Sequence, residues 1–320
     1  MFAGASLSGI VSWKRSSINR ASLVDVLNSK RTHAARVRNM ESGANTHHTD
    51  LPFDMVAVDL DGTLLRDDKQ VTVRTVKTIQ KAIKHGVKVV IATARPPRGM
   101  RHIAEALKID TYWVTYNGAM IFDPKINKHI HHQPLPSALA KKIVKAARKA
   151  DKDCVISLEI LDKWYTDHVD ESLPTEISRH FSPDFVGPLE AFLKVPVTKL
   201  LALAPPERIP NIRMAVEKKF AGQVTAAVSD NHLLQYIHKD ADKCIALKKV
   251  ANLYDIDPSR VMCIGDAPND VSMIQWAGKG VAVSNAWDCA KQVADAIVPS
   301  NEEAGVAYAI RKFVFGEDLD

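Results

Sequence analysis

The segment AVDLDGTLLRDD, residues 57–68, decides the fold. The run MVAVDL that enters it has the aliphatic and β-branched residues typical of a buried strand. This run is closed by two carboxylates, Asp59 and Asp61, with a single leucine between them. Because a buried charge costs free energy unless it is paired or bound to a metal ion, the segment predicts a polar site at a strand end.

Downstream of this segment, predicted strands and helices alternate. We expect strands at 55–60, 87–93 and 111–119, and helices at 71–86 and 96–109. The strands are nearly uninterrupted apolar runs, which is the pattern of a parallel sheet covered on both faces. The fold class is therefore predicted to be α/β, with a doubly wound parallel sheet.

The first predicted helix has clear end signals. Thr72 is a candidate N-cap and Gly86 a candidate stop. Its apolar residues are expected on one face; they are Val73, Val76, Ile79 and Ile83.

The middle of the chain has a different pattern, which predicts an inserted second domain. A hairpin at 121–136 is followed by a helix at 139–150, short strands and a further helix, and the strand–helix alternation resumes near residue 242. The predicted division is a leader at 1–50, a core domain at 51–134 and 239–320, and an inserted α+β domain at 135–238.

Composition and charge narrow the function classes. The chain of 320 residues is 46% hydrophobic and 25% charged, with a formal net charge of +6. Seven basic and three acidic residues in 1–50 give +4, and the remaining 36 basic and 34 acidic residues give only +2. No basic stripe is interleaved with aromatic residues, so nucleic acid is not expected as a partner. No apolar run is long enough for a transmembrane helix, so no membrane partner is expected either.

The cysteines and the leader bear on the compartment. The four cysteines are far apart and form no CxxC pair, which favours a reducing compartment over a disulfide framework; they are Cys154, Cys244, Cys263 and Cys289. The leader is rich in Ser, Ala and Arg, and Asp25 is its only acidic residue before Met40. This composition favours a transit peptide for a plastid or mitochondrion over a disordered extension. Without such targeting, or with a start at Met40, the protein is expected to be cytoplasmic.

Polar residues gather at the predicted carboxyl ends of the strands, where ligands bind in open parallel sheets. Such a convergence is a stronger signal than any one carboxylate. The residues are Asp59, Asp61, Thr93, Asn117, Gly118, Gly265, Asp266, Asn269 and Asp270.

The carboxylates among these residues predict a metal site. Asp59, Asp61, Asp266 and Asp270 would repel one another without a cation, and oxygen ligands suit Mg²⁺ in a phosphate site. A carboxylate can also attack phosphorus as a nucleophile. Since side chains alternate along a strand, Asp59 and Asp61 are expected on the same side, so that one attacks while the other handles a proton.

These segments resemble the motifs of the haloacid dehalogenase superfamily of phosphohydrolases. DLDGTLL resembles the first motif, IATAR the second, DKCIAL the lysine-bearing third and GDAPND the fourth. The resemblance covers about residues 53–315 and is similar to the Cof-type branch (subfamily IIB), in which an α/β cap lies between motifs II and III. The inserted domain at 135–238 would be this cap.

The resemblance implies catalytic roles for four residues. Asp59 would be the nucleophile, and Asp61 the general acid and then the general base. Thr93 would bind a phosphoryl oxygen, and Lys243 would neutralise charge on the phosphoryl group. One departure is Ala94, since a glycine usually follows the threonine of the second motif and permits backbone conformations that alanine resists.

The resemblance also implies ligands for the metal and the substrate. Mg²⁺ would be bound by Asp59, Asp266 and the backbone carbonyl of Asp61, and Asp270 would either bind the metal or orient water bound to it. Substrate contacts would come from Thr93, Asn117, Gly118, Lys243 and Asn269.

Two further clusters are given structural roles. The tract HIHHQ, with His129, His131 and His132, favours a polar hairpin over a metal site, because no third ligand for one face is evident. Trp164 and Tyr165 are expected to pack within the cap.

The resulting hypothesis is a Mg²⁺-dependent phosphatase that hydrolyses a small phosphomonoester through an aspartyl-phosphate. A hexose-phosphate mutase type of phosphotransferase and an inactive phospho-ligand-binding protein are the alternatives. Sugar phosphates, nucleotide or flavin phosphates and pyridoxal phosphate all stay open as substrates, and both a monomer and a homodimer are compatible with the sequence.

Overall fold

The structure is a computed structural model that describes residues 50–319, apart from the side chains of 228–230. The leader and its predicted targeting function lie outside the described residues, except for Asp50.

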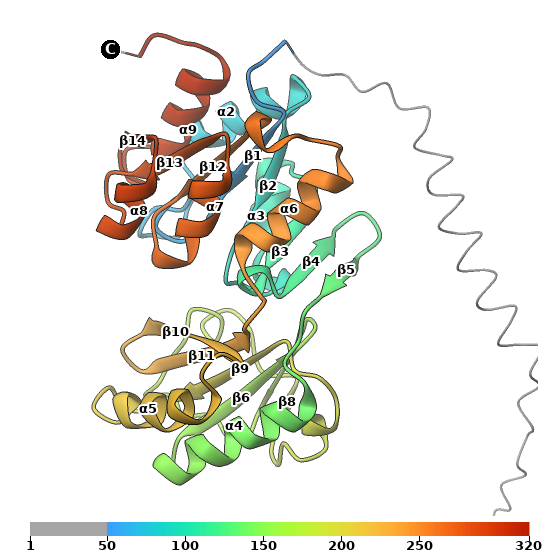
Figure 1. Cartoon of the computed structure of the whole chain (residues 1–320), viewed down its shortest axis with the longest axis vertical. Coiled ribbons are helices and arrows are strands. Elements are labelled where there is room, and N and C mark those ends of the chain that lie inside the picture. The colour runs from blue at the N-terminus through green and yellow to red at the C-terminus, as the bar shows by residue number, and fades with distance from the viewer. Residues whose placement is uncertain (1–49, 320) are drawn as a thin grey trace, which may run out of the picture. The chain divides into compact units, whose positions relative to one another are not determined.

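The larger sheet has five parallel strands in the order β14-β13-β12-β1-β2 (Figure 1). Its strand β1 leads into the segment 57–68. The four apolar residues of this strand are all buried, which requires that both faces of the sheet are covered. The strands are β1 (Met55–Val58), β2 (Lys88–Ile91), β12 (Val261–Gly265), β13 (Lys279–Val283) and β14 (Ala296–Val298).

The third predicted strand only touches this sheet. A single parallel bridge between Ala92 and Val114 links β2 to β3 (Trp113–Thr115). β3 then pairs antiparallel with β4 (Met120–Asp123), which pairs with β5 (Lys128–His132). The expected third parallel strand is therefore a short strand at the start of an antiparallel meander, and the expected hairpin is β4–β5.

Helices cover both faces of the five-stranded sheet, which confirms the doubly wound α/β class. Val56 and Val58 of β1 lie in one apolar cluster with α2, α3, α8 and α9, whereas Met55 and Ala57 lie in another with α6 and α7. Alternate residues of the same strand thus face opposite helical layers. The helices are α2 (Val73–Lys84), α3 (Arg101–Leu107), α6 (Lys243–Leu253), α7 (Val271–Trp276), α8 (Asp288–Val293) and α9 (Gly305–Ala309).

The end signals of α2 are confirmed. The Thr72 hydroxyl accepts a hydrogen bond from the Thr75 backbone N–H, and Gly86 follows the helix with a φ of +90°. Ile79 is buried, but Val73 is 70% exposed. The expectation that Val73 shares the buried face is wrong, because the buried face of α2 is formed by Thr75, Thr78, Ile79 and Ala82.

A second sheet has six strands in the order β10-β11-β9-β6-β7-β8, and only the β7–β8 pair is parallel. Two helices, α4 (Ser137–Ala150) and α5 (Ile209–Phe220), share an apolar cluster with one face of this sheet. The strands are β6 (Val155–Ile160), β7 (Lys163–Thr166), β8 (Phe185–Val186), β9 (Lys199–Leu203), β10 (Val224–Asp230) and β11 (Leu233–His238). These elements fall within 135–238; the division of the chain into domains stays an interpretation.

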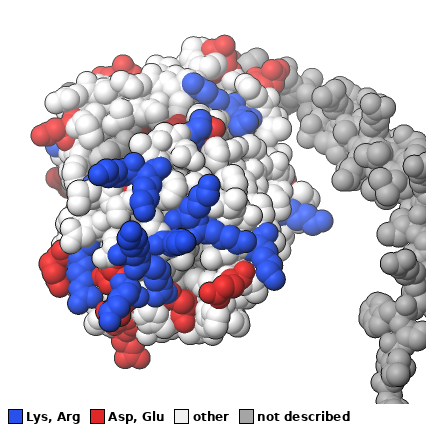
Figure 2. Space-filling view, turned by 60° about the horizontal axis from the view of Figure 1, so that its bottom comes forward, with Lys and Arg blue, Asp and Glu red and all other residues white. Residues whose placement is uncertain are grey.

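The outer surface of α4 and α5 is rich in lysine. Figure 2 views the molecule from the end where these helices lie and shows basic side chains gathered there. Exposed lysines on these helices are Lys141, Lys142, Lys145, Lys149, Lys218 and Lys219. The small net charge downstream of the leader therefore hides a local basic surface. α4 contains no aromatic residue and the only one in α5, Phe220, is buried, so the surface lacks the aromatic interleaving typical of nucleic-acid sites.

Two sequence-level expectations concern membranes and cysteines. Within residues 50–319, the helices are too short or too polar to cross a bilayer. The four cysteines are free thiols, and three of them are buried.

Candidate active site

The site is built at the carboxyl ends of three adjacent strands. β12, β1 and β2 lie side by side, and Asp266, Asp59 and Thr93 follow them directly or after one residue. The backbone N–H of Asp59 donates to the Ile264 carbonyl at 3.0 Å, which extends the β1–β12 pairing to the start of the site. The fold thus brings together residues more than 200 positions apart in the sequence.

Lys243 is the central cation of the site. Its Nζ donates to Asp59 Oδ1 and to Asp270 Oδ1, both at 2.6 Å, and its side chain is fully buried. Burial alone would lower the pKa of Lys243, but Asp270 and Asp59 outweigh it and raise the pKa above its ordinary value. Lys243 is the first residue of α6, whose N-cap Asp242 accepts from the Ile245 N–H. The structure thus buries the lysine that the resemblance assigns to the third motif.

Three carboxylates surround this lysine. Among the described residues, Asp59, Asp266 and Asp270 form a buried group whose ligand oxygens lie within 4.8 Å of one another. Burial raises the pKa of Asp59 well above its usual value; Asp270 and Asp266 add to this and Lys243 opposes it. Burial likewise raises the pKa of Asp266 to about 6. One ammonium does not balance three carboxylates, so the group suits a further, hard cation with oxygen ligands.

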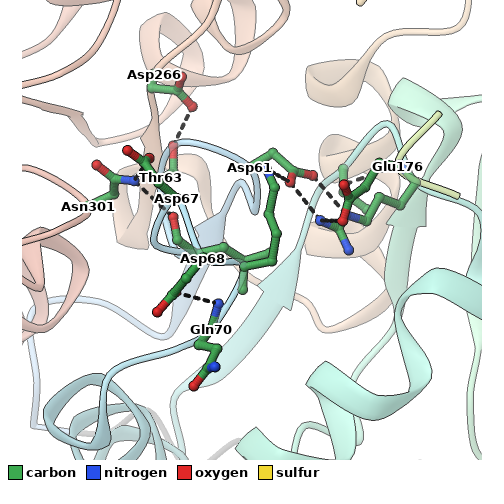
Figure 3. Close-up of polar contacts among 12 residues, drawn as sticks. Asp61, Thr63, Asp67, Asp68, Gln70, Glu176, Asp266 and Asn301 are labelled. Carbon is green, nitrogen blue, oxygen red and sulfur yellow. Dashed lines mark hydrogen bonds and ion pairs between the residues drawn. The ribbon is translucent and has the colours of Figure 1, made fainter. Parts of the chain in front are cut away.

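The segment around Asp266 is fixed by hydrogen bonds. Asp266 Oδ1 accepts from the Thr63 hydroxyl at 2.6 Å (Figure 3). Asp270 Oδ2 accepts from the backbone N–H groups of Asp266 and Ala267, both at 3.0 Å. Gly62 has a φ of +84°, and a Cβ there would lie 2.6 Å from Asp266 Oδ2. The glycine of the first motif is therefore required by both conformation and space.

Asp61 lies apart from the carboxylate group. It accepts from Arg95 Nε at 2.8 Å and Nη2 at 2.6 Å, and from Lys69 Nζ at 3.0 Å. Burial would raise the pKa of Asp61, but its bonds with Arg95 and the charges of Arg95 and Lys69 lower it. Figure 3 shows Asp61 turned toward Glu176 and away from the Thr63–Asp266 pair.

The expectation that strand alternation puts Asp59 and Asp61 on the same side is wrong, because neither residue lies within β1. β1 ends at Val58, and a turn follows, so alternation does not extend to Asp61. The two side chains contact different partners: Asp59 contacts Lys243, and Asp61 contacts Arg95 and Lys69.

The second motif tolerates its alanine. Thr93 is buried, and its hydroxyl accepts from the Arg95 N–H at 3.1 Å. Among the described residues, those with a positive φ do not include Ala94, so its backbone conformation is one that alanine adopts without strain. The missing glycine therefore does not disturb this turn.

The predicted substrate residues differ in what they do. Asn269 Nδ2 donates to Asn117 Oδ1 at 3.0 Å, so these two amides lie together. The Asn117 N–H donates to the Thr93 carbonyl at 2.9 Å, which ties it to the second motif. Gly118 has a φ of +91°, and a Cβ there would lie 2.1 Å from the Asp242 carbonyl oxygen. Gly118 thus permits close packing against the start of α6.

Arg95, Thr63 and Lys69 were missed by the sequence analysis. Arg95 could have been noticed, since it is the only cation in the motif IATAR and two carboxylates end the neighbouring strand. Thr63 and Lys69 gave no such signal, because their contacts with Asp266 and Asp61 depend on the turn after β1.

The two clusters given structural roles lie elsewhere. His129, His131 and His132 are on β5 of the β4–β5 hairpin, and His132 Nε2 lies 2.9 Å from Thr198 Oγ1. Tyr165 stacks on Phe192 with 4.1 Å between ring centroids.

Known proteins resemble this chain over most of its length. A family model described as haloacid dehalogenase-like hydrolase matches residues 56–310. The chain is 32% identical over 267 residues to 5-amino-6-(5-phospho-D-ribitylamino)uracil phosphatase YitU of Bacillus subtilis (strain 168); the match covers 81% of this chain and 97% of that protein. It is 25% identical over 272 residues to HMP-PP phosphatase of Yersinia enterocolitica, with 83% and 97% covered.

Solved structures share the fold. A haloacid dehalogenase-like hydrolase from Bacteroides thetaiotaomicron superposes with a TM-score of 0.75 at 24% identity, covering 81% of this chain and 99% of that one. At this identity the likeness concerns the fold alone.

Proposed function

Since the chain belongs to the haloacid dehalogenase-like hydrolases, in the Cof-type branch that its sequence resembles, we propose that it is a Mg²⁺-dependent phosphatase acting through an aspartyl-phosphate on Asp59. It is a phosphoric monoester hydrolase by family. The observation that carries the proposal is the buried group of Asp59, Lys243, Asp266 and Asp270 at the ends of β1 and β12.

Asp59 is the proposed nucleophile. Its carboxylate oxygen attacks phosphorus, the bond from phosphorus to the ester oxygen breaks, and the departing oxygen takes a proton from Asp61. Asp61 then takes a proton from water, whose oxygen attacks the same phosphorus and releases inorganic phosphate and free Asp59. Because Arg95 and Lys69 favour the carboxylate form of Asp61, Asp61 must leave this ion pair and take up a proton from solvent before it can act as the acid.

The donor set fits Mg²⁺. Asp59, Asp266 and Asp270 supply only oxygens, and burial, with a further contribution from the charge of Asp270, raises the pKa of Asp266 to about 6. When bound, Mg²⁺ would stabilise negative charge on the transferring phosphoryl group. Lys243 would neutralise charge beside the nucleophile, and Thr93 would bind a phosphoryl oxygen. Asn269 would contact the phosphoryl group and orient it.

The substrate is proposed to be a small phosphorylated metabolite. We would test first the two compounds for which relatives are named, 5-amino-6-(5-phospho-D-ribitylamino)uracil and HMP-PP. The same substrate panel should contain sugar phosphates, nucleotides, flavin phosphates and pyridoxal phosphate. The leader is proposed to direct the chain to a plastid or mitochondrion.

Hydrolysis of an aryl phosphate tests the reaction class. The purified chain should release inorganic phosphate with Mg²⁺ and lose this activity with a chelator, and Asp59→Asn should reduce it to background. Product analysis on the panel separates hydrolysis from isomerisation of a sugar phosphate. Full activity in Asp59→Asn, or release of an isomer without inorganic phosphate, contradicts the proposal.

A further inference from the structure

Lys199 is a buried cation outside the motifs. It is the first residue of β9 in the six-stranded sheet and is 5% exposed. Its Nζ donates to the Ala94 carbonyl at 3.3 Å and lies 5.2 Å from the centroid of the Tyr116 ring. No carboxylate of the described residues forms an ion pair with it, and the bond to Ala94 is its one hydrogen bond among them. An ammonium has three donors, so Lys199 is buried with incomplete compensation.

The carboxylate opposite Lys199 in the sheet, that of Glu159, forms hydrogen bonds with other residues. Glu159 is the cross-strand neighbour of Lys199, but its Oε1 accepts from Arg98 Nη2 at 2.6 Å and its Oε2 from the Tyr116 hydroxyl at 3.1 Å. Burial lowers the pKa of Lys199 to about 8; the charge of Glu159 opposes this shift and that of Arg98 adds to it. Burying the Lys199 ammonium here therefore lowers the stability of the fold, so a functional role would explain why a lysine occupies this position.

The carbonyl that Lys199 contacts lies within the second motif. Ala94 separates Thr93, the proposed ligand of a phosphoryl oxygen, from Arg95, which binds Asp61 through two hydrogen bonds. The Arg95 N–H also donates to the Thr93 hydroxyl across this residue. A group that fixes the Ala94 carbonyl thus fixes the peptides on both sides of it.

We propose that Lys199 is a positioning residue for phosphoryl transfer: from the six-stranded sheet it holds the Ala94 carbonyl and thereby the turn that carries Thr93 and Arg95. This inference rests on the proposed function, because it assigns Lys199 to the same site. Its role is exerted through the turn and requires no contact between Lys199 and the substrate.

Replacing Lys199 should lower the activity without lowering the stability. Methionine has nearly the length of lysine and no charge, so Lys199→Met removes a poorly compensated buried ammonium and retains most of the packing. The variant should melt at the wild-type temperature or above it. Its kcat for an aryl phosphate should fall about ten- to a hundred-fold while KM stays within about two-fold, because the turn is no longer fixed. Lys141→Met, on the exposed surface of α4, is the matched control and should match the wild type.

Hydrogen exchange provides a readout that does not depend on phosphatase activity. In Lys199→Met the amides of Thr93, Ala94 and Arg95 should exchange faster than in the wild type and in Lys141→Met, while those of β1 stay unchanged. Wild-type kcat in Lys199→Met with unchanged exchange overturns the inference, and so does a melting temperature lowered by several degrees, which would indicate a merely structural lysine. If the wild type hydrolyses no phosphate ester, the proposed function fails, and exchange at residues 93–95 then decides whether Lys199 fixes this turn.

Discussion

Lys243 and Asp59 form a buried ion pair, with 2.6 Å between Nζ and Oδ1, and the same Nζ lies 2.6 Å from Asp270 Oδ1. The lysine starts a helix that follows the six-stranded sheet, whereas Asp59 ends the first strand of the chain's parallel sheet. This pair links the third motif to the first. It also puts the compensating charge beside the oxygen that is proposed to attack phosphorus.

Replacing this lysine should impair both catalysis and folding. Lys243→Met leaves three buried carboxylates without their ammonium, so we expect kcat to fall about 10²–10³-fold and the protein to melt earlier at neutral pH. Steady-state kinetics and thermal melts measure these effects. Lys249→Met, on an exposed position of the same helix, is the control. A Lys243→Met variant with wild-type kcat would remove the lysine from the mechanism.

Mg²⁺ should stabilise the protein more at neutral than at acidic pH. The pKa of Asp266 is raised from 3.8 to about 6, so the folded state binds this proton more tightly than the unfolded state does. For the metal-free protein, this group therefore removes stability as the pH rises from about 4 through about 6, and Mg²⁺ should restore it. Melting temperatures with and without Mg²⁺ at about pH 5 and about pH 7.5 measure the difference. An equal shift at both pH values, or the same shift in Asp266→Asn, argues against a metal held by this carboxylate.

Arg95 should control the acid limb of the pH–rate profile. It lowers the pKa of Asp61, so Arg95→Met should raise that pKa. Because Asp61 must be ionised to take a proton from water in the second step, the acid limb for hydrolysis of the aspartyl-phosphate should move to higher pH. The pH profile of the variant measures this shift. Arg74→Met, an exposed arginine on α2, should leave the profile in place. A profile of Arg95→Met that coincides with the wild type would show that Asp61 does not set the acid limb.

Gly62 offers a test with an internal control. Gly62→Ala places a Cβ 2.6 Å from Asp266 Oδ2 at a φ of +84°, whereas Gly222→Ala has a similar φ of +71° and nothing within 4 Å. Both variants should lose about 1 kcal/mol from backbone strain. Gly62→Ala alone should also lose most of its activity and need more Mg²⁺ for half-maximal rate. Equal activity losses in the two variants would show that the space beside Asp266 is not what requires the glycine.

The parts of the site that the sequence predicts are those encoded locally. Asp59, Thr93 and Asp266 each follow an apolar run, and the carboxyl ends of adjacent parallel strands meet at one edge whatever the loops do. Lys243 needed more than a local pattern, since Lys239, Lys248 and Lys249 lie close by in the sequence. The resemblance of DKCIAL to the third motif singled it out, and the structure buries it.

The parts that the sequence does not predict depend on contacts between distant segments. Strand alternation does not predict the orientation of Asp61, because β1 ends at Val58 and Asp61 lies in the turn that follows. The orientation of Asp61 depends on its hydrogen bonds with Arg95 and Lys69. The short strand β3 pairs antiparallel with β4, and a run of three residues does not reveal in advance which strand it will pair with. The sequence around Lys199 does not distinguish it from an ordinary strand lysine. Its proposed role follows only from its contacts with the Ala94 carbonyl and the Tyr116 ring.

The most direct test of the account is to look for the phosphoryl group on Asp59. Asp61→Asn should still form the aspartyl-phosphate from an activated aryl phosphate but hydrolyse it slowly, so the intermediate should accumulate. Acid quenching followed by peptide mass spectrometry should find one added phosphoryl group on the peptide that contains Asp59 and none in the Asp59→Asn/Asp61→Asn double variant. A hydrolytically active protein whose quenched peptides carry the phosphoryl group at another residue, or at none, would contradict the central claim.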